Sequence, residues 1–132
     1  MSLESQVRQF NTTYAKEMST APRLPTEPEA TLMNNLIHEE LMELNEAIDA
    51  GDLIEIADAI GDILYVTAQQ ATIIGLPVDA LLREIQRSNL SKLGADGKPM
   101  YREDGKVLKG PNFSEPDIAG VLVAYCKEVS DV

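Results

Sequence analysis

Apolar residues recur at helical spacing along most of the chain. Val7, Phe10 and Tyr14 lie three and four residues apart. This spacing predicts a first helix over about residues 3–18. Several prolines follow, and they predict a loop because proline cannot continue a helix. A second helix is predicted over about residues 29–50, where an i, i+4, i+7 pattern forms an apolar stripe of Met33, Ile37, Leu41, Leu44 and Ile48.

A third helix is predicted over about residues 53–74, and it is apolar over most of its circumference. Gly51 is a typical residue at the end of a helix, and Asp52 is suited to cap the helix that follows. Because the third helix is apolar over most of its circumference, we expect it to be buried centrally. A narrow polar strip interrupts its apolar surface and consists of Glu55, Asp58 and Asp62.

The C-terminal part combines two more predicted helices with an extended segment. A fourth helix is predicted over about residues 78–92, and a last one over about residues 114–127 with Ser114 as its cap. Short extended runs on either side of an Asp-Gly pair predict a hairpin-like insertion near residues 99–109. The whole chain, residues 1–132, is thus expected to form a single all-α domain, a bundle of four to five helices.

Charge is distributed unevenly over a chain whose formal net charge is −11. Between Arg23 and Arg83 there is no Lys or Arg, whereas nine Asp and Glu lie between Glu39 and Asp62. Seven of the eleven Lys and Arg then follow between Arg83 and Lys109. Carboxylates without a local cation repel one another, unless they spread into solvent, take up protons or bind a metal. This arrangement suits a site for a metal ion and a polyphosphate.

Composition excludes several classes of function. The negative charge argues against nucleic acid or an anionic membrane as a main partner, because both require clustered positive charge. The apolar stretches are too short to span a bilayer, and the polar N-terminus lacks the features of a signal peptide. Cys126 is the only cysteine, so no internal disulfide can form. These features predict a cytoplasmic protein.

The turn at Gly51 places acidic residues of two helices together. Two helices joined by a short turn pack antiparallel, so residues equidistant from the turn face each other. Glu40 is therefore expected near Asp62. The residue as far after the turn as Glu43 is before it is Ala59. Glu43 is therefore expected near Asp58, which precedes Ala59 in the sequence.

Carboxylate ligands of this kind favour a hard divalent cation, Mg²⁺ or Mn²⁺. Glu55 is a further candidate ligand, ranked behind the two aspartates because its mirror position is closer to the turn. Zinc is disfavoured, because His38 is the only histidine and Cys126 the only thiol. An acidic helix face is often only a solvated surface, and we assign that role to Glu46, Asp49 and Asp52.

The acidic residues also follow an EExxE…ExxD pattern, in residues 38–43 and 55–58. This pattern resembles that of the all-α nucleoside triphosphate pyrophosphohydrolases, which include MazG, the dimeric dUTPases and phosphoribosyl-ATP pyrophosphohydrolase. The likeness covers about residues 29–113, and its last part is similar to the MazG-like and phosphoribosyl-ATP pyrophosphohydrolase-like branch. It continues beyond the acidic pattern through residues 58–67, 87–92 and 96–113.

The chain departs from the family pattern in one respect. The interval from Glu43 to Glu55 is short, and Asp62 lies one turn beyond the ExxD pair. Asp62 is an alternative match for the aspartate of the family's ExxD pattern. In that alignment Asp58 takes the place of the glutamate of the pattern. Whether Glu55 or Asp62 completes the site stays open, and both alignments retain Glu40, Glu43 and Asp58.

The resemblance implies hydrolysis of a nucleoside triphosphate between its α and β phosphates, which gives a monophosphate and pyrophosphate. One or two Mg²⁺ ions neutralise charge and activate a water in such a reaction, and Glu39 or a neighbouring carboxylate is a candidate base. Asn89 and Lys92 share a face of the fourth helix and are candidate substrate-binding residues, although Asn89 is equally suited to cap that helix. Lys109, on the Gly-rich segment, is a third candidate.

Three alternatives remain open. The housekeeping nucleotide pyrophosphohydrolase is the leading hypothesis, and phosphoribosyl-ATP pyrophosphohydrolase of histidine biosynthesis is the second. A non-catalytic helical module that binds metal is the third. Since a chain of this size forms a shallow core and the family pairs such cores, we expect a homodimer or a dimer of dimers. The preferred base and sugar do not follow from the sequence.

Overall fold

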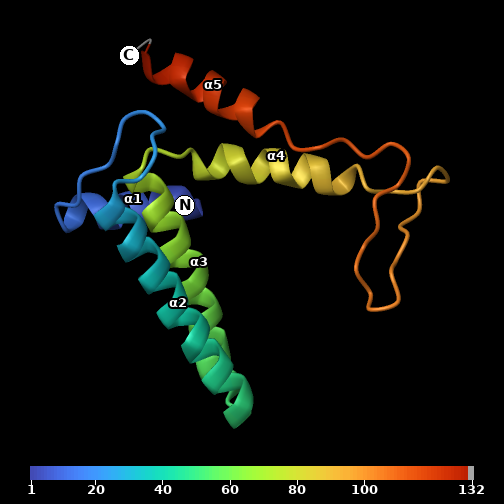
Figure 1. Ribbon diagram of the computed structural model, residues 1–132, viewed down its shortest axis with the longest axis horizontal. Helices are drawn as coiled ribbons and strands as arrows, with labels where there is room; N and C mark the ends of the chain where they lie inside the picture. The colour runs from blue at the N-terminus through green and yellow to red at the C-terminus, as the bar shows by residue number, and fades with distance from the viewer. Residues whose placement is uncertain (131–132) are drawn as a thin grey trace. The chain divides into compact units, whose positions relative to one another are not determined.

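The computed structural model describes residues 1–130, and the chain divides into two compact units, Met1–Val78 and Asp79–Val132. We call them the N-terminal unit and the C-terminal unit. The described residues form five helices and no strand, so the predicted all-α fold class is confirmed (Figure 1). No helix within this part of the chain is long and apolar enough to cross a membrane. The organisation as a single domain stays a prediction.

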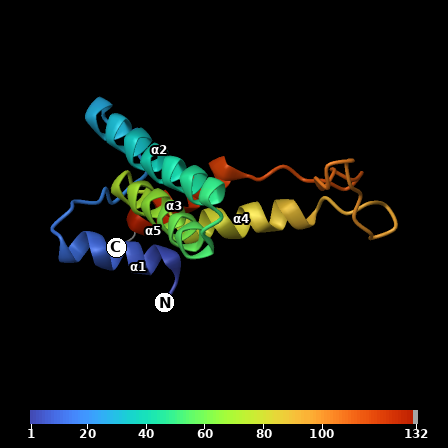
Figure 2. The same cartoon turned by 90° about the horizontal axis from the view of Figure 1, so that it is seen from below.

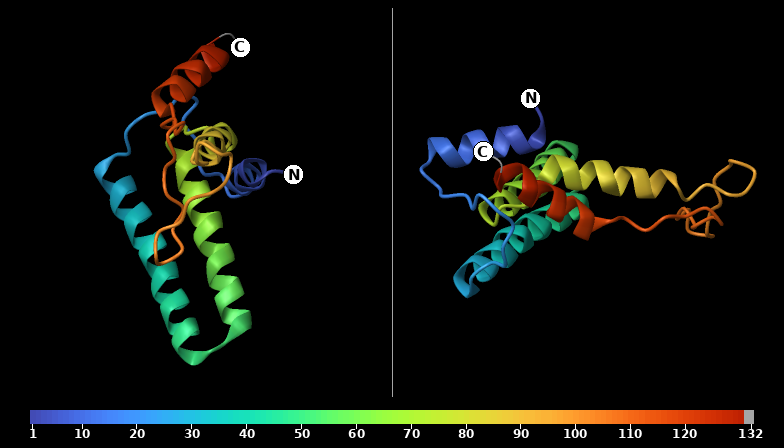
Figure 3. Two further views of the ribbon diagram at one scale, coloured as in Figure 1. Left: turned by 90° about the vertical axis from the view of Figure 1, so that its right-hand side faces the viewer. Right: turned by 90° about the horizontal axis from the view of Figure 1, so that it is seen from above.

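The N-terminal unit contains α1 (Leu3–Thr13), α2 (Glu27–Ala50) and α3 (Leu53–Ile73). The helices α2 and α3 form a long antiparallel hairpin, as the sequence predicts. The helix α1 packs against α3, which lies between the other two (Figures 2 and 3). Both long helices therefore present a face to the same hairpin interface, where the predicted acidic residues lie.

Local hydrogen bonds define the ends of the hairpin helices. Thr26 begins α2 with a capping box, in which its side chain accepts from the backbone N–H of Glu29 and that glutamate accepts from Thr26. Gly51 ends α2 in the left-handed conformation, with φ of 64°. Asp52 then caps α3 by accepting a 3.1 Å hydrogen bond from the backbone N–H of Glu55. The predicted roles of Gly51 and Asp52 are confirmed.

The helix α1 ends at Thr13, so the predicted extension to about residue 18 is wrong. Ala15 adopts a left-handed φ of 53°. The backbone N–H of Lys16 donates to the carbonyl of Asn11 at 2.8 Å, and that of Ala15 donates to Thr12 at 3.3 Å. This pair of hydrogen bonds is a Schellman motif, which here ends a helix without the glycine that usually marks it.

A small core holds α1 against α3. Val7, Ala68 and Val78 form a buried cluster, and Leu3 and Tyr65 pack against it. Beside this cluster lies a buried polar network. In that network the amide of Asn11 donates to the Thr72 hydroxyl at 2.8 Å and accepts from Gln69 at 3.2 Å.

The expectation that α3 is buried centrally, apart from its polar strip, is wrong for the single chain. Ile60 and Leu64, one helical turn apart, are 46% and 58% exposed. The reason is that α1 and α2 cover two sides of α3 and no further helix of the N-terminal unit covers this one. An apolar strip on α3 thus faces outward.

The C-terminal unit contains α4 (Val78–Leu90), which begins at the boundary residue, and α5 (Ile118–Ser130). Between them, Tyr101 and Val107 form an antiparallel bridge, and the backbone N–H of Arg102 donates to Lys106 at 2.7 Å. The predicted hairpin-like insertion is therefore confirmed. It consists of a single bridge and a turn at Gly105, with no longer strand ladder.

The helix α5 begins at Ile118, so the prediction that Ser114 caps it is wrong. Asp117 instead accepts a 3.0 Å hydrogen bond from the backbone N–H of Gly120. Pro116 disfavours helical geometry at the residue before it. Ser114 uses its backbone groups for hydrogen bonds to the side chains of Ser88 on α4 and of Ser91 just after it.

Candidate metal centre

Three carboxylates meet at the interface of the α2–α3 hairpin. Glu40 and Glu43 lie one turn apart on α2, and Asp62 lies opposite them on α3. One carboxylate oxygen of each residue lies within 4.8 Å of the other two. The antiparallel register about Gly51 explains this meeting, because Glu40 and Asp62 are equally distant from the turn.

Glu40 is the least accessible member of this acidic cluster. Its Oε2 atom is shielded from solvent and has no hydrogen-bond partner among residues 1–130. Burial raises the pKa of Glu40, and the nearby carboxylates of Glu43, Asp62 and Asp58 raise it further. A shielded carboxylate oxygen without a partner is energetically unfavourable unless a proton or a cation satisfies it.

The donor set of the cluster fits a hard divalent cation. It offers three carboxylate oxygens and no nitrogen or sulfur ligand. Within residues 1–130, none of the ion pairs involves Glu40, Glu43 or Asp62. A cation bound here would supply the partner that Glu40 Oε2 lacks.

Asp58 and Glu55 lie beside the cluster on the side of the turn. Together with Glu43 they line a groove between α2 and α3 that extends toward Asp52. Asp58 is close enough to Glu40 for its charge to raise the pKa of that residue. The cluster of mutually close oxygens, however, contains Asp62 and neither of these two residues.

The groove is also lined by acidic residues for which only a solvated role was predicted. Glu46 and Asp52 line it together with Glu43, and both are exposed. Their position was predictable in part, since Glu46 follows Glu43 by three residues on the same helix face. Asp52 already uses its carboxylate to cap α3.

Glu39 lies on α2 next to Glu40 and is exposed. It is not one of the three residues whose oxygens are gathered. Adjacent residues of a helix point about 100° apart, which explains why Glu39 and Glu40 differ in burial. The role of Glu39 as a base stays a prediction.

The predicted substrate-binding residues belong to the C-terminal unit. The backbone N–H of Gly110 donates a 2.8 Å hydrogen bond to the carbonyl of Lys92, and this bond brings Lys109 beside Lys92. The ammonium group of Lys109 lies 4.6 Å from the centre of the Phe113 ring. Asn89 is exposed in the last turn of α4.

Comparison with known families finds a match for the larger part of the chain. The model of the phosphoribosyl-ATP pyrophosphohydrolase family matches residues 7–89, which is more than half of the chain. The matched segment includes the whole acidic cluster and Asn89, and it ends before Lys92 and Lys109. Comparison with individual characterised proteins finds no match.

Proposed function

This chain belongs to the phosphoribosyl-ATP pyrophosphohydrolase family, within the MazG-like superfamily, and on that basis we propose that it hydrolyses a nucleoside triphosphate. Water attacks at the α–β phosphate bond, and the products are a nucleoside monophosphate and pyrophosphate. The observation that carries the proposal is the acidic cluster of Glu40, Glu43 and Asp62, with its shielded and unpartnered Glu40 oxygen.

In this proposal the acidic cluster holds Mg²⁺, with Mn²⁺ as the alternative ion. Glu40, Glu43 and Asp62 are the ligands, and Asp58 or Glu55 completes the set from the adjoining groove. When bound, the ion neutralises charge on the phosphate oxygens and lowers the pKa of a water.

Residues outside the acidic cluster have two roles in the proposal. Glu39, exposed on the same helix, accepts the proton from the attacking water. Lys92 and Lys109 bind phosphate oxygens through their ammonium groups, and Asn89 donates a hydrogen bond to phosphate, sugar or base. Their positions beside one another at the end of α4 support this assignment.

The matched family itself supports a second candidate, phosphoribosyl-ATP as the substrate. The bond cleaved and the metal chemistry are the same, and the substrate is bulkier. A non-catalytic module that binds only metal is the remaining alternative. It requires the acidic cluster but gives no role to the lysines of the C-terminal unit.

We propose that the active protein is a homodimer or a dimer of dimers. The support is the outward-facing apolar strip of α3, defined by Ile60 and Leu64. Burial of such a strip against a second copy removes apolar surface from water, at about 25 cal/mol per Å². The single Cys126 is consistent with a cytoplasmic location, which we include in the proposal.

Pyrophosphate release tests the proposed reaction directly. The purified protein is incubated with the common ribo- and deoxyribonucleoside triphosphates and with phosphoribosyl-ATP, in Mg²⁺ and in chelator. We expect release from one or a few substrates, only in the presence of metal. Release from phosphoribosyl-ATP alone would select the second candidate, and no release from any substrate by folded protein would contradict the enzymatic proposal.

Thermal stability separates the enzyme from a metal-binding module. A ligand that binds only the folded state raises the melting temperature according to its concentration and affinity. For the enzyme, Mg²⁺ together with a non-hydrolysable nucleotide raises the melting temperature above the value in Mg²⁺ alone. For the module, the nucleotide adds nothing to the effect of Mg²⁺.

A further inference from the structure

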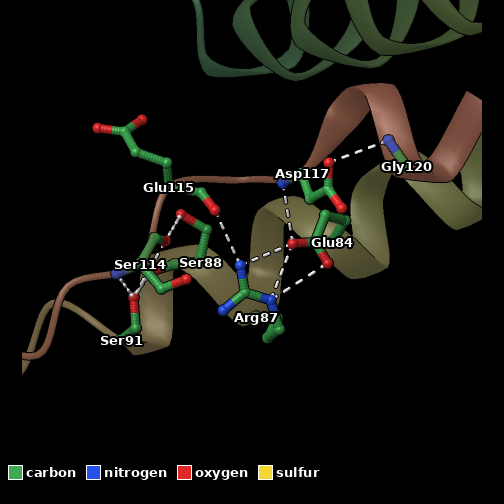
Figure 4. A network of polar contacts seen from close by, with 8 residues as sticks. All are labelled: Glu84, Arg87, Ser88, Ser91, Ser114, Glu115, Asp117 and Gly120. Carbon is green, nitrogen blue, oxygen red and sulfur yellow. Dashed lines mark hydrogen bonds and ion pairs between the residues drawn. The ribbon is translucent and has the colours of Figure 1, made fainter.

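Residues 110–117 lie along α4 in an antiparallel direction, and we call them the docked segment (Figure 4). Its first residue, Gly110, contacts Lys92 after the end of α4. Its last residue, Asp117, contacts Glu84 two turns earlier on the same helix. All of these contacts lie within the C-terminal unit. The docked segment therefore follows the C-terminal half of α4, from Glu84 onward.

Serines in the last turn of α4 and just after it hold the middle of the docked segment. The hydroxyl of Ser88, a buried residue, donates to the carbonyl of Ser114 at 2.8 Å. The backbone N–H of Ser114 in turn donates to the hydroxyl of Ser91 at 2.9 Å. Both backbone groups of Ser114 thus have side-chain partners, one from α4 and one from the residues just after it.

Arg87 links the docked segment to Glu84. Its guanidinium group donates to the carbonyl of Glu115 at 3.0 Å and forms a 2.7 Å ion pair with Glu84. The carboxylate of Glu84 also accepts a 3.1 Å hydrogen bond from the backbone N–H of Asp117. The hydrogen bond from Arg87, and then that from Asp117, lower the pKa of Glu84. One arginine therefore contacts the segment directly and also orients the acceptor for a second contact.

The approach is closest at Gly110. A Cβ atom built on this residue would lie 2.0 Å from the carbonyl oxygen of Leu93, so a side chain at this position would force the two segments apart. Together with the hydrogen bond to Lys92, this packing fixes the backbone of Lys109 next to that of Lys92. These two lysines are seventeen positions apart in sequence.

The docked segment also orients the side chain of Lys109. The ammonium group lies 4.6 Å from the centre of the Phe113 ring and 3.6 Å from the carboxylate of Glu115. Both partners belong to the docked segment. At an exposed site each contact is weak, so the orientation of Lys109 depends on the segment staying in place.

We propose that Arg87 is a positioning residue, which keeps the docked segment on α4 so that Lys109 and Lys92 bind one phosphate chain together. This inference rests on the proposed function, which assigns both lysines to phosphate. When both ammonium groups are already in place, binding of the anion does not require a mobile segment to become ordered. The smaller loss of conformational entropy makes binding tighter. Arg87 itself needs no contact with the ligand in this arrangement.

The test is a double-mutant cycle with inorganic tripolyphosphate and Mg²⁺ as the probe. Isothermal titration gives its Kd for the wild type, Arg87→Lys, Lys109→Met and the double variant. Arg83→Lys is the matched control, because Arg83 lies on α4 one turn earlier and is exposed. Hydrogen exchange of the Asp117 amide reports release of the docked segment, and Ser91→Ala releases the segment by a second route.

We expect Arg87→Lys to speed exchange at Asp117 and to weaken tripolyphosphate binding about five- to tenfold. In the Lys109→Met background, the same substitution should change the Kd by less than about twofold, because coupled residues are not additive. In the enzyme assay, KM should rise with kcat nearly unchanged. Ser91→Ala should act in the same direction, and Arg83→Lys should have no effect.

Additive losses from Arg87→Lys and Lys109→Met would overturn the inference, since Arg87 would then act independently of Lys109. Faster exchange at Asp117 with an unchanged Kd would also overturn it. The wild type could release pyrophosphate from a nucleotide and yet bind no tripolyphosphate. This result would contradict the inference about Arg87 but not the proposed reaction. A wild type without pyrophosphate release contradicts the proposed function itself.

Discussion

Glu40 on α2 and Asp62 on α3 face each other across the helical hairpin, with carboxylate oxygens within 4.8 Å of one another. Two negative charges at this distance repel each other, by a few kcal/mol at an effective dielectric constant of about 20. Folding brings them together nevertheless, because the turn at Gly51 and Asp52 sets the antiparallel register of α2 and α3. The fold thus maintains a pair of carboxylates that is unfavourable unless a proton or a cation is bound.

Glu40→Gln and Asp62→Asn should each reduce pyrophosphate release by at least about a hundredfold, because each removes a charged ligand of the proposed metal ion. The metal-free variants should be at least as stable as the wild type, since each loses a like-charge contact. Pyrophosphate assays and thermal melts in chelator measure the two effects.

The control for these variants is Asp49→Asn, which removes one charge from an exposed position of α2. It should leave both activity and melting temperature close to those of the wild type. Full activity in both Glu40→Gln and Asp62→Asn would refute the proposed metal centre.

Asn11 joins α1 to α3 through hydrogen bonds to Thr72 and Gln69, and it is completely buried. Asn11→Ala should lower the free energy of unfolding by about 1–3 kcal/mol, because it leaves buried polar groups without partners. Urea unfolding measures this loss. Gln9→Ala, at an exposed position of α1, should change stability little, and an equal loss in both variants would argue against the network as the cause.

Glu29 gives the N-terminal unit a predictable response to acid. Hydrogen bonds from Arg23 and then from the backbone of Thr26 lower the pKa of Glu29 to about 2, from an ordinary value of 4.5. A depressed folded-state pKa means that the ionised group stabilises the fold above pH 4.5, and that this contribution disappears as the pH falls through about 2.

The wild type should therefore have a larger free energy of unfolding than Glu29→Gln near pH 6. Near pH 2 the two proteins should have similar free energies of unfolding. Urea titrations at the two pH values measure the difference. Glu27→Gln is the matched control, because Glu27 lies exposed in the same first turn of α2. A wild-type advantage that is constant over this range of pH would contradict the assignment.

The sequence predicts the hairpin and its acidic interface because both depend on local signals. Gly51 ends one helix and Asp52 begins the next, so the turn and its two caps are readable from neighbouring residues. Once the turn is known, simple counting places Glu40 opposite Asp62. Which acid completes the cluster, Glu55 or Asp62, depends on side-chain direction, and counting alone does not decide it.

Two boundaries of helices could not be predicted from the sequence. The end of α1 carries no glycine or proline, and Ala15 takes the left-handed conformation instead. Ser114 has the chemistry of a helix cap, but Ser88 and Ser91 engage its backbone groups. Such competition between local and long-range partners is decided by tertiary packing, which a single sequence does not display.

The apolar strip of α3 links the fold to the proposed assembly. Periodicity alone predicts that Ile60 and Leu64 are buried, and in the single chain they are 46% and 58% exposed. Burial of these residues by a second copy would reconcile the pattern with the structure. The strip is therefore the place where a substitution should separate the copies.

Ile60→Lys, alone and with Leu64→Lys, should convert the proposed oligomer into monomers, because a charged side chain would have to be buried without a partner. Sedimentation velocity at several concentrations measures the state. Leu24→Lys is the control, because Leu24 is an isolated apolar residue that is 88% exposed in the proline-rich loop. If the wild type sediments as a monomer, or if Ile60→Lys keeps the wild-type assembly, the strip of α3 is not the interface.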